Sequence, residues 1–512
     1  MSKVLYIPLD ERTCNYDFPQ KLARMTDDIE LLVPPAEMMG FKKRPADIEQ
    51  LWAWVAEHAP ECSYAILSVD TLVYGNIINS RTHHKSEAEC IALVNQFRKL
   101  KQDNPELHIH AFNLVARVAA YNSDSEDPDY WAEYGLKIWR YAYFKDKQGR
   151  GLLSDAESSV LSVLESDIPE EYLQDFLNRR AVDRMVNLQC VDLVEENVFD
   201  MLTIPKDDTA EYGYAAMDHQ ALTQRICEKQ LMNRILVYPG ADEVGSVLFA
   251  RVFNQIKGYT PRVYVRYSST FGPYLVPLYE DRPMNEGIKA QIHSMGGVMS
   301  DSADQSDCML AVNAPGVHMI ESSAQFHKDI TFSTHRNLND FFAMQQYYHK
   351  TYCRPVGLAD VATSNGCENE CMDLARLNHS FDFLTAVGGW NTTANTVGVV
   401  LAQLAIASYY HGFNQAPDRL QLSRNFMLEH LTADWLYQSN VLPQYLQETQ
   451  EKWNPFALDD HYDETVSYFK EHIQALLNAK FPEGLFGKRI VLTKLSFQWN
   501  GAFYVHLSVA QI

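Results

Sequence analysis

The chain has 512 residues, of which 46% are hydrophobic and 21% are charged, and its formal net charge is −22 at neutral pH. Two or three domains are expected from this length, because a single hydrophobic core seldom grows beyond about 250–300 residues. The acidic excess argues against nucleic-acid binding, since affinity for a phosphate backbone depends largely on Lys and Arg releasing counterions.

Residues 1–115 alternate apolar runs with amphipathic segments. Strands are predicted at KVLYIPL, IELLVPP, YAILSVD and LHIHAFNLV, and helices at 47–58 and 86–101 between them. This alternation is the βαβ pattern of a mostly parallel sheet. A polar and aromatic helical insert is expected to follow at about 120–198.

A second α/β region begins at FDMLTIPKDD and continues through NRILVYPGADE, RVYVRYSS, GGVMSDS, CMLAVNAPG, PVGLADVATSNG and FLTAVGGWN. Helices are predicted at about 218–232, 244–257, 285–295 and 394–410. GGVMSDS and CMLAVNAPG lie too close together for a helix to separate them. The fold class predicted is therefore α/β, with doubly wound, mostly parallel sheets in two lobes, and a (β/α)₈-like barrel is the alternative.

The C-terminal region is predicted to be helical from residue 416 until RIVLTKLSFQWNGAFYVHLSVA, which reads as a β-hairpin. Alternating apolar residues flank Asn500 and Gly501 there, and Asn-Gly is a strong hairpin signal. The predicted domains are an N-terminal α/β lobe with its insert at 1–198, a second α/β lobe at 199–415 and a C-terminal region at 416–512.

A cytoplasmic protein is expected. The N-terminus turns charged before any apolar run of signal-peptide length, and the longest apolar stretch, TVGVVLAQLAIASYY, is too short to span a membrane. The nine cysteines include no CxxC, and Cys367 and Cys371 have no second pair nearby to complete a metal site. The aromatic content of 12% leaves room for a homodimer interface.

Several predicted strands end in polar or charged side chains. Each such residue alone could cap a helix, but the carboxyl ends of parallel strands meet at one edge of a sheet, where ligands bind. We therefore expect these groups to converge on one pocket. The predicted catalytic residues are Asp207, Asp208, Asp242 and Glu243. The predicted substrate-binding residues are Asp10, Arg12, Asn15, Asp70, Tyr74, Arg81, Asp360, Asn365, Trp390, Asn391 and Asn395.

Two kinds of chemistry suit a cluster of carboxylates. Two acids in unlike environments can divide the roles of proton donor and proton acceptor. The same oxygens could instead hold a divalent cation such as Mg²⁺ or Mn²⁺. A sugar would also fit, because Asn391 and Asn395 can bond hydroxyls and Trp390 or Tyr74 can stack on a ring.

Five motifs in this order, YIPLDERTCN, SVDTLVYGNIINSR, DDTAEYG, GADE and GGWNTTANTVG, resemble a bacterial family catalogued as domain of unknown function 4127. The resemblance covers about residues 3–435, and LSFQWNGAF in the C-terminal region departs from the pattern. Membership implies a soluble α/β protein and assigns no reaction.

The leading hypothesis is a hydrolase of a small polar, carbohydrate-like substrate that works by carboxylate acid/base chemistry without an organic cofactor. The first alternative is a hydrolase or isomerase that uses the same carboxylates to hold a divalent metal. The second alternative is a non-enzymatic binding protein in which Arg12, Arg81 and Arg117 bind an anionic ligand. No nucleic-acid or membrane partner is expected.

Overall fold

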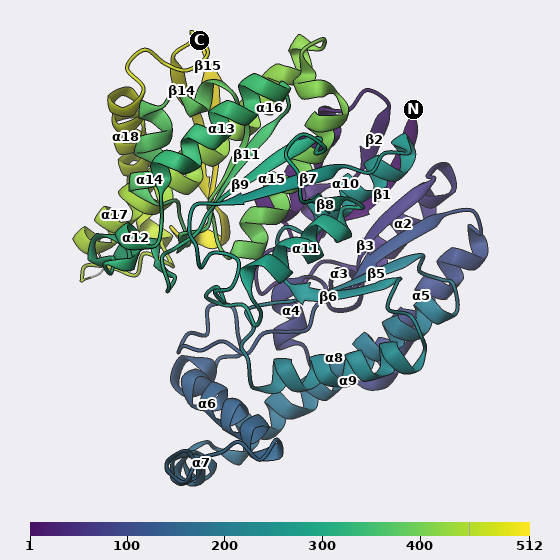
Figure 1. The fold of residues 1–512 in the computed structure, drawn as a ribbon. Coiled ribbons are helices and arrows are strands. Elements are labelled where there is room, and N and C mark those ends of the chain that lie inside the picture. Colours follow the sequence, from purple (N-terminus) through teal and green to yellow (C-terminus); the bar gives the residue numbers. More distant parts are fainter. Residues whose placement is uncertain (450) are drawn as a thin grey trace. The chain divides into compact units, whose positions relative to one another are not determined.

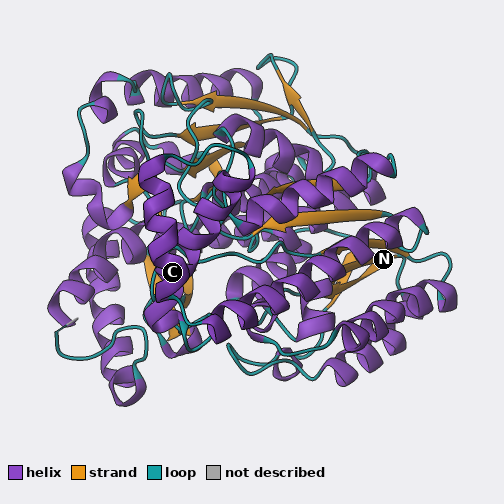
Figure 2. Ribbon diagram, turned by 90° about the horizontal axis from the view of Figure 1, so that it is seen from below, coloured by secondary structure: helices purple, strands orange, loops and turns teal. Residues whose placement is uncertain are grey.

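The computed structural model describes residues 1–449 and 451–512, and it divides into two compact units. Unit 1 comprises Met1–Glu11, Asp28–Gly245 and Tyr279–Asp281, and unit 2 comprises Arg12–Asp27, Ser246–Leu278 and Arg282–Ile512. Each unit contains a parallel sheet whose strands are joined mainly by helices (Figures 1 and 2). The predicted α/β class is confirmed.

The sheet of unit 1 has six parallel strands in the order β2-β1-β3-β4-β5-β6. They are β1 (Ser2–Ile7), β2 (Ile29–Leu32), β3 (Tyr64–Ser68), β4 (His108–Phe112), β5 (Met201–Lys206) and β6 (Ile235–Pro239). The chain moves from β1 to one side for β2 and then to the other side for β3. The direction of winding reverses between β1 and β3, and the carboxyl ends at such a reversal form the usual ligand crevice of open α/β sheets.

The helices of unit 1 form the crossovers and the predicted insert. They are α2 (Ile48–His58), α3 (Val69–Tyr74), α4 (Ile77–Thr82), α5 (Glu87–Asp103), α6 (Trp131–Gly149), α7 (Asp155–Asp167), α8 (Glu170–Glu195) and α9 (Tyr214–Glu228). Capping boxes at Ser86–Glu89 and Ser154–Glu157 fix the starts of α5 and α7, because each side chain bonds a free amide of the other residue. The insert packs its own small core of Trp131, Ile138, Leu161 and Phe176 among others.

The sheet of unit 2 has five parallel strands in the order β13-β11-β9-β7-β8. They are β7 (Arg262–Tyr267), β8 (Val298–Ser300), β9 (Cys308–Asn313), β11 (Val356–Asp360) and β13 (Leu384–Gly388). Taken in chain order, the strands follow the same 2-1-3-4-5 sequence as the first five strands of unit 1, and the winding reverses between β7 and β9. A small two-stranded sheet pairs β10 (Ile320–Glu321) with β12 (Thr363–Ser364).

The first group of helices in unit 2 accompanies this sheet: α1 (Thr13–Arg24), α10 (Val244–Lys257, whose first two residues belong to unit 1), α11 (Met284–Ser294), α12 (Thr331–Thr334), α13 (Leu338–Tyr352), α14 (Asn369–Leu377) and α15 (Thr393–Tyr409). The apolar stretch TVGVVLAQLAIASYY lies in α15, which is buried along almost its whole length. In the described residues, none of the helices combines the length and the apolar character needed to cross a membrane.

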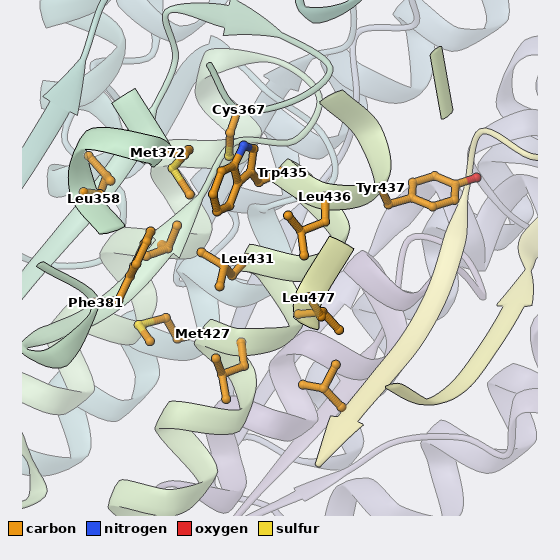
Figure 3. Close-up of a cluster of buried hydrophobic side chains, with 14 of the residues drawn as sticks. Leu358, Cys367, Met372, Phe381, Met427, Leu431, Trp435, Leu436, Tyr437 and Leu477 are labelled. Atoms are coloured by element: carbon orange, nitrogen blue, oxygen red, sulfur yellow. The ribbon is translucent and has the colours of Figure 1, made fainter. Parts of the chain in front are cut away.

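The C-terminal elements complete unit 2: α16 (Pro417–His430), a π-helix (Leu431–Val441), α17 (Leu442–Thr449), α18 (Tyr462–Lys480) and the predicted hairpin of β14 (Ile490–Phe497) and β15 (Val505–Gln511). Their apolar faces share one core with the sheet, in which Trp435 and Met427 lie among residues of β11 and α14 (Figure 3). Residues 416–512 therefore pack together with the second sheet.

The closed barrel, which was the alternative prediction, is not seen among the described residues; each main sheet is open and ends in edge strands, β2 and β6 in unit 1 and β13 and β8 in unit 2. The two units also divide the chain at points other than the predicted boundaries at 198 and 415. The reason is that β5 pairs with β4 and β6 pairs with β5, which keeps both strands in the sheet of unit 1.

Candidate functional site

The carboxyl edge of the unit 1 sheet, meaning the segments that directly follow its strands together with α4, carries eight of the predicted site residues. All eight except Asp208 are buried. They are Asp10 after β1, Asp70, Tyr74 and Arg81 after β3, Asp207 and Asp208 after β5, and Asp242 and Glu243 after β6.

The ends of β1 and β3 are tied together where the winding reverses. The Thr71 hydroxyl donates to the carbonyl oxygens of Pro8 (2.7 Å) and Leu9 (2.9 Å). Ser68 accepts a hydrogen bond from the Thr71 amide (3.1 Å) and so starts α3. These bonds fix the backbone immediately before Asp10 and around Asp70.

Asp70 is a buried acid whose hydrogen bonds lie within unit 1. Its Oδ2 accepts from the Leu114 amide (2.9 Å) and from Asn113 Nδ2 (3.2 Å), and Asn113 Oδ1 in turn accepts from Asn187 Nδ2 (2.5 Å). Burial raises the pKa of Asp70 to about 7, although these donors partly offset the effect. The carboxyl group thus joins the end of β3 to the end of β4.

A buried ionic cluster occupies the edge after β4 and β5. Arg81 contacts Asp207 through Nη2 (2.5 Å) and Glu126 through Nη1 (3.2 Å). Arg117 Nη1 lies 3.2 Å from Asp208 Oδ2. The same guanidinium contacts two residues that the sequence did not single out, Asp127 (2.7 Å) and Glu126 (3.2 Å). Four carboxyl groups therefore surround two guanidinium groups.

Asp207 and Asp208 lie in unlike environments. The Asp207 side chain is 9% exposed and contacts Arg81, whereas the Asp208 side chain is 27% exposed. Burial, followed by the neighbouring charge of Asp207, raises the pKa of Asp208 to about 6. Asp208 has a φ of 33°, so the chain leaves the extended conformation of β5 here.

Lys206, the last residue of β5, is a second feature that the sequence did not reveal as part of the site. Its side chain is fully buried, forms an ion pair with Asp281 and lies 3.3 Å from His219 Nδ1. The feature of the sequence that could have identified Lys206 is its position directly before an Asp-Asp pair. Its burial depends on Asp281, 75 residues further along the chain.

The loop after β6 is held by Glu243. Its Oε2 accepts from the Ala241 amide (3.0 Å), and the Gly240 amide donates to the Lys206 carbonyl (3.1 Å), which joins this loop to β5. Gly240 has a φ of 146°, and a Cβ atom on it would lie 2.0 Å from Glu243 Oε1. The side chain of Glu243 is therefore part of the loop's own structure.

The other predicted site residues, Arg12, Asn15, Asp360, Asn365, Trp390, Asn391 and Asn395, belong to unit 2. Asp360 repeats the arrangement of Asp70: its Oδ1 accepts from Asn313 Nδ2 (2.8 Å) on the neighbouring strand β9. Its Oδ2 accepts from the Glu368 amide (2.8 Å). Burial, followed by the charge of Glu368, raises the pKa of Asp360 to about 7. Glu368 forms a buried two-bond pair with Arg336 (2.6 and 2.8 Å).

The asparagines of unit 2 shape its loops. Asn365 and Asn391 both have positive φ, and the Asn365 amide donates to the Asn391 carbonyl (3.0 Å). The amide of Asn395 donates to Thr392 Oγ1 (3.4 Å), a weak bond at the start of α15.

Aromatic rings gather around the other predicted residues of unit 2. Trp390 lies edge-on to Tyr504, with ring centroids 6.0 Å apart. The Arg12 guanidinium lies over the rings of Trp499 (4.6 Å) and Tyr504 (5.0 Å). Asn15 is buried in α1. Arg12 is therefore in contact with aromatic side chains at the start of that helix.

Two histidines of unit 1 contact carboxyl groups. His83 contacts Asp183 (3.0 Å) and stacks on Tyr74 (4.5 Å between centroids), while His108 contacts Asp200 at the amino end of the sheet (3.1 Å). Across residues 1–449 and 451–512, no group of three or more His, Cys, Asp or Glu side chains has the arrangement of a metal site.

Comparison with known proteins gives a family for this chain. The sequence profile of the family described as Protein of unknown function (DUF4127) matches residues 4–508. This range includes the C-terminal hairpin, beyond the resemblance to residue 435 that the motifs indicated. Searches of curated proteins and of solved structures gave no match. Since the match spans nearly the whole chain, the protein belongs to the DUF4127 family.

Proposed function

We propose that the carboxyl edge of unit 1 is the active site of a hydrolase that acts on a small polar, carbohydrate-like substrate. The observation that carries the proposal is the unlike pair Asp207 and Asp208. Asp207 is held beside Arg81, and Asp208 is partly exposed with a pKa raised to about 6. Two acids in unlike environments are the usual basis for dividing acid and base roles.

In this proposal Asp208 is the proton donor and Asp207 the base or nucleophile. A donor with a pKa of about 6 is half protonated at that pH, which suits proton transfer to a leaving group near neutrality. The contact with Arg81 at 2.5 Å fixes the position of the Asp207 carboxylate, as a base or nucleophile requires.

The charges of the cluster favour a neutral substrate over an anion. Arg81 and Arg117 already contact four carboxyl groups, so their positive charge is locally outweighed. A ligand rich in hydroxyl groups could donate hydrogen bonds to these oxygens, whereas an anion would be repelled. This balance supports the hydrolase over an anion-binding protein that relies on Arg81 and Arg117.

The test begins with a panel of chromogenic glycosides, and the variants Asp207→Asn and Asp208→Asn are then compared on the substrate that is turned over. We expect each variant to lower kcat by about 100- to 10,000-fold, the usual contribution of a general acid or base. In the wild type, kcat/KM should fall as the pH rises above about 6, because Asp208 loses its proton. Asp200→Asn, at the amino end of the same sheet, is the matched control and should keep full activity.

Unchanged turnover in both variants would refute the assignment. Loss of activity after chelation, with recovery on adding Mg²⁺ or Mn²⁺, would assign the metal-dependent mechanism to the same carboxylates instead. If a panel member raises the melting temperature but is recovered unchanged, the non-enzymatic alternative is correct.

The cytoplasm, inferred from the cysteine spacing, is the proposed compartment, and a homodimer stays a prediction.

A further inference from the structure

A pocket of about 60 Å³ lies within unit 2, and none of the residues assigned to catalysis above is among its lining residues. Its walls come from α1, the end of α16, the π-helix, the hairpin and Trp390, and all of its lining residues belong to unit 2. Its volume corresponds to roughly two molecules of liquid water, at about 30 Å³ each. The pocket therefore has room for a hydroxyl-bearing group of a larger ligand.

A histidine with a fixed ring lines this pocket. His430 Nδ1 lies 3.0 Å from Asp434 Oδ2, and the same oxygen accepts from the Gly389 amide (3.0 Å). A carboxylate oxygen is an acceptor, so Nδ1 carries a hydrogen, and the tautomer with its hydrogen on Nδ1 has its lone pair on Nε2. The rings of Phe18 (4.8 Å) and Phe426 (4.7 Å) hold the imidazole edge-on.

The π-helix fixes the carboxylate that orients this histidine. The Asp434 carbonyl accepts from the Cys367 amide (2.9 Å) and from Ser439 Oγ (3.2 Å), which anchors the π-helix to the segment after β12. π-helical turns are rare and occur frequently at functional sites. The residues His430 and Asp434 stand four apart across the junction of α16 with the π-helix, so the pair depends on this local geometry.

Two of the lining residues each carry a buried polar atom that lacks a hydrogen-bond partner within the described residues: His430 Nε2 and Thr13 Oγ1. Both residues are more than nine-tenths buried. Buried polar groups are nearly always hydrogen-bonded in native proteins. A ligand that donates a hydrogen bond to His430 Nε2 and also bonds the Thr13 hydroxyl would supply the missing partner of each group. The acceptor at Nε2 calls for an O–H or N–H group on that ligand.

The remaining lining defines the class of ligand. Trp390 and Tyr504 supply aromatic surface, which packs against the C–H face of a sugar ring or polyol. Lys21 and Glu429 neutralise each other at 2.6 Å, so they present no net charge to a ligand. We propose that this pocket is a second ligand site, which binds a neutral polyhydroxy compound through a hydroxyl that donates to His430 Nε2.

The test uses the full-length protein with ¹⁵N-labelled histidine and two probes. Methyl β-D-glucopyranoside carries hydroxyl donors, and its fully O-methylated derivative keeps the ring but has none. We expect the His430 resonances, identified by their loss in His430→Asn, to show hydrogen on Nδ1 in the free protein. The glucoside should shift the Nε2 resonance in a saturable way, and the methylated derivative should leave it in place.

Calorimetry with the glucoside then compares variants. His430→Asn keeps a donor for Asp434 and removes the Nε2 acceptor, so binding should weaken by about 10-fold, which corresponds to about 1.4 kcal/mol. His472→Gln is the matched control, because His472 is bonded through Nδ1 to the Tyr468 carbonyl outside the pocket, and it should bind as the wild type does. Circular dichroism verifies that each variant is folded.

Three results would overturn the proposal: hydrogen on Nε2 in the free protein, no saturable response to the glucoside, or an equal response to the methylated derivative. Asp208→Asn separates this site from the proposed hydrolase. It should lower kcat by about 100- to 10,000-fold and leave glucoside binding at His430 unchanged, so the two proposals can fail independently.

Discussion

Replacement of Asp70 by Asn tests whether the end of β3 holds a buried acid that resists ionisation. Asp70 is 1% exposed, and its Oδ2 accepts from the Leu114 amide and Asn113 Nδ2. Asn has the same shape, and its Oδ1 can keep these two bonds. The substitution therefore removes the titration with little change in packing.

The magnitude follows from the pKa of Asp70. A rise from 3.8 to about 7 corresponds to about 4 kcal/mol, at roughly 1.4 kcal/mol per pH unit. Because the native state binds the proton more tightly than the unfolded chain, this stability is fully present below about pH 4 and is lost as the pH rises through about 7. Roughly 2.5 kcal/mol of the loss lies between pH 5 and pH 8.

Urea denaturation at pH 5, 6, 7 and 8 measures this effect, with hydrogen exchange of peptides from β3 and β4 to assign the transition to unit 1. The free energy of unfolding of the wild type, relative to Asp70→Asn, should fall by about 2.5 kcal/mol over this range. Asp200→Asn is the control. Burial opposes ionisation of Asp200, but hydrogen bonds from the Ile109 amide and His108 lower its pKa. The contribution of Asp200 to the free energy of unfolding is therefore constant above pH 5. Parallel pH profiles for the wild type and Asp70→Asn would refute the reasoning.

Three further substitutions test other parts of the structure. Glu368→Gln breaks the fully buried pair with Arg336 and should cost about 3–5 kcal/mol in urea denaturation; a cost under about 1 kcal/mol would show that the pair is solvated. Gly240→Ala should lower the melting temperature, because φ is 146° and the new Cβ would meet Glu243; an unchanged melting temperature would mean that the loop rearranges freely. Trp435→Ala should cost about 3–5 kcal/mol by leaving a cavity in the unit 2 core, measurable by calorimetric unfolding, and a near-neutral effect would contradict the packing in Figure 3.

Local patterns predicted the elements well, since strand and helix periodicity depends on neighbouring residues. The helix predicted at 244–257 is found at those residues, and the one predicted at 218–232 is found at Tyr214–Glu228. The grouping of strands into units could not be read this way, because the pairing of β5 with β4 joins segments separated by the whole helical insert.

In the candidate site, too, some residues could be predicted from local sequence and others could not. Asp10, Asp70, Asp207 and Asp242 were predicted from their positions after predicted strands, and all four lie at the carboxyl edge of one sheet. Glu126 and Asp127 were missed, because they lie in a loop with no periodic pattern. The pair His430 and Asp434 was also missed, since four-residue spacing is common on helices.

The sequence by itself determined the α/β class, the individual strands and helices and the family, because these depend on local periodicity and on motif identity. Only the tertiary structure decided which carboxylate faces which guanidinium, that Asp208 and Asp70 hold their protons to higher pH, and that His430 is oriented by Asp434. The physical reason is that pKa values and hydrogen-bond partners depend on burial and on distances of a few ångströms between segments that lie far apart along the chain.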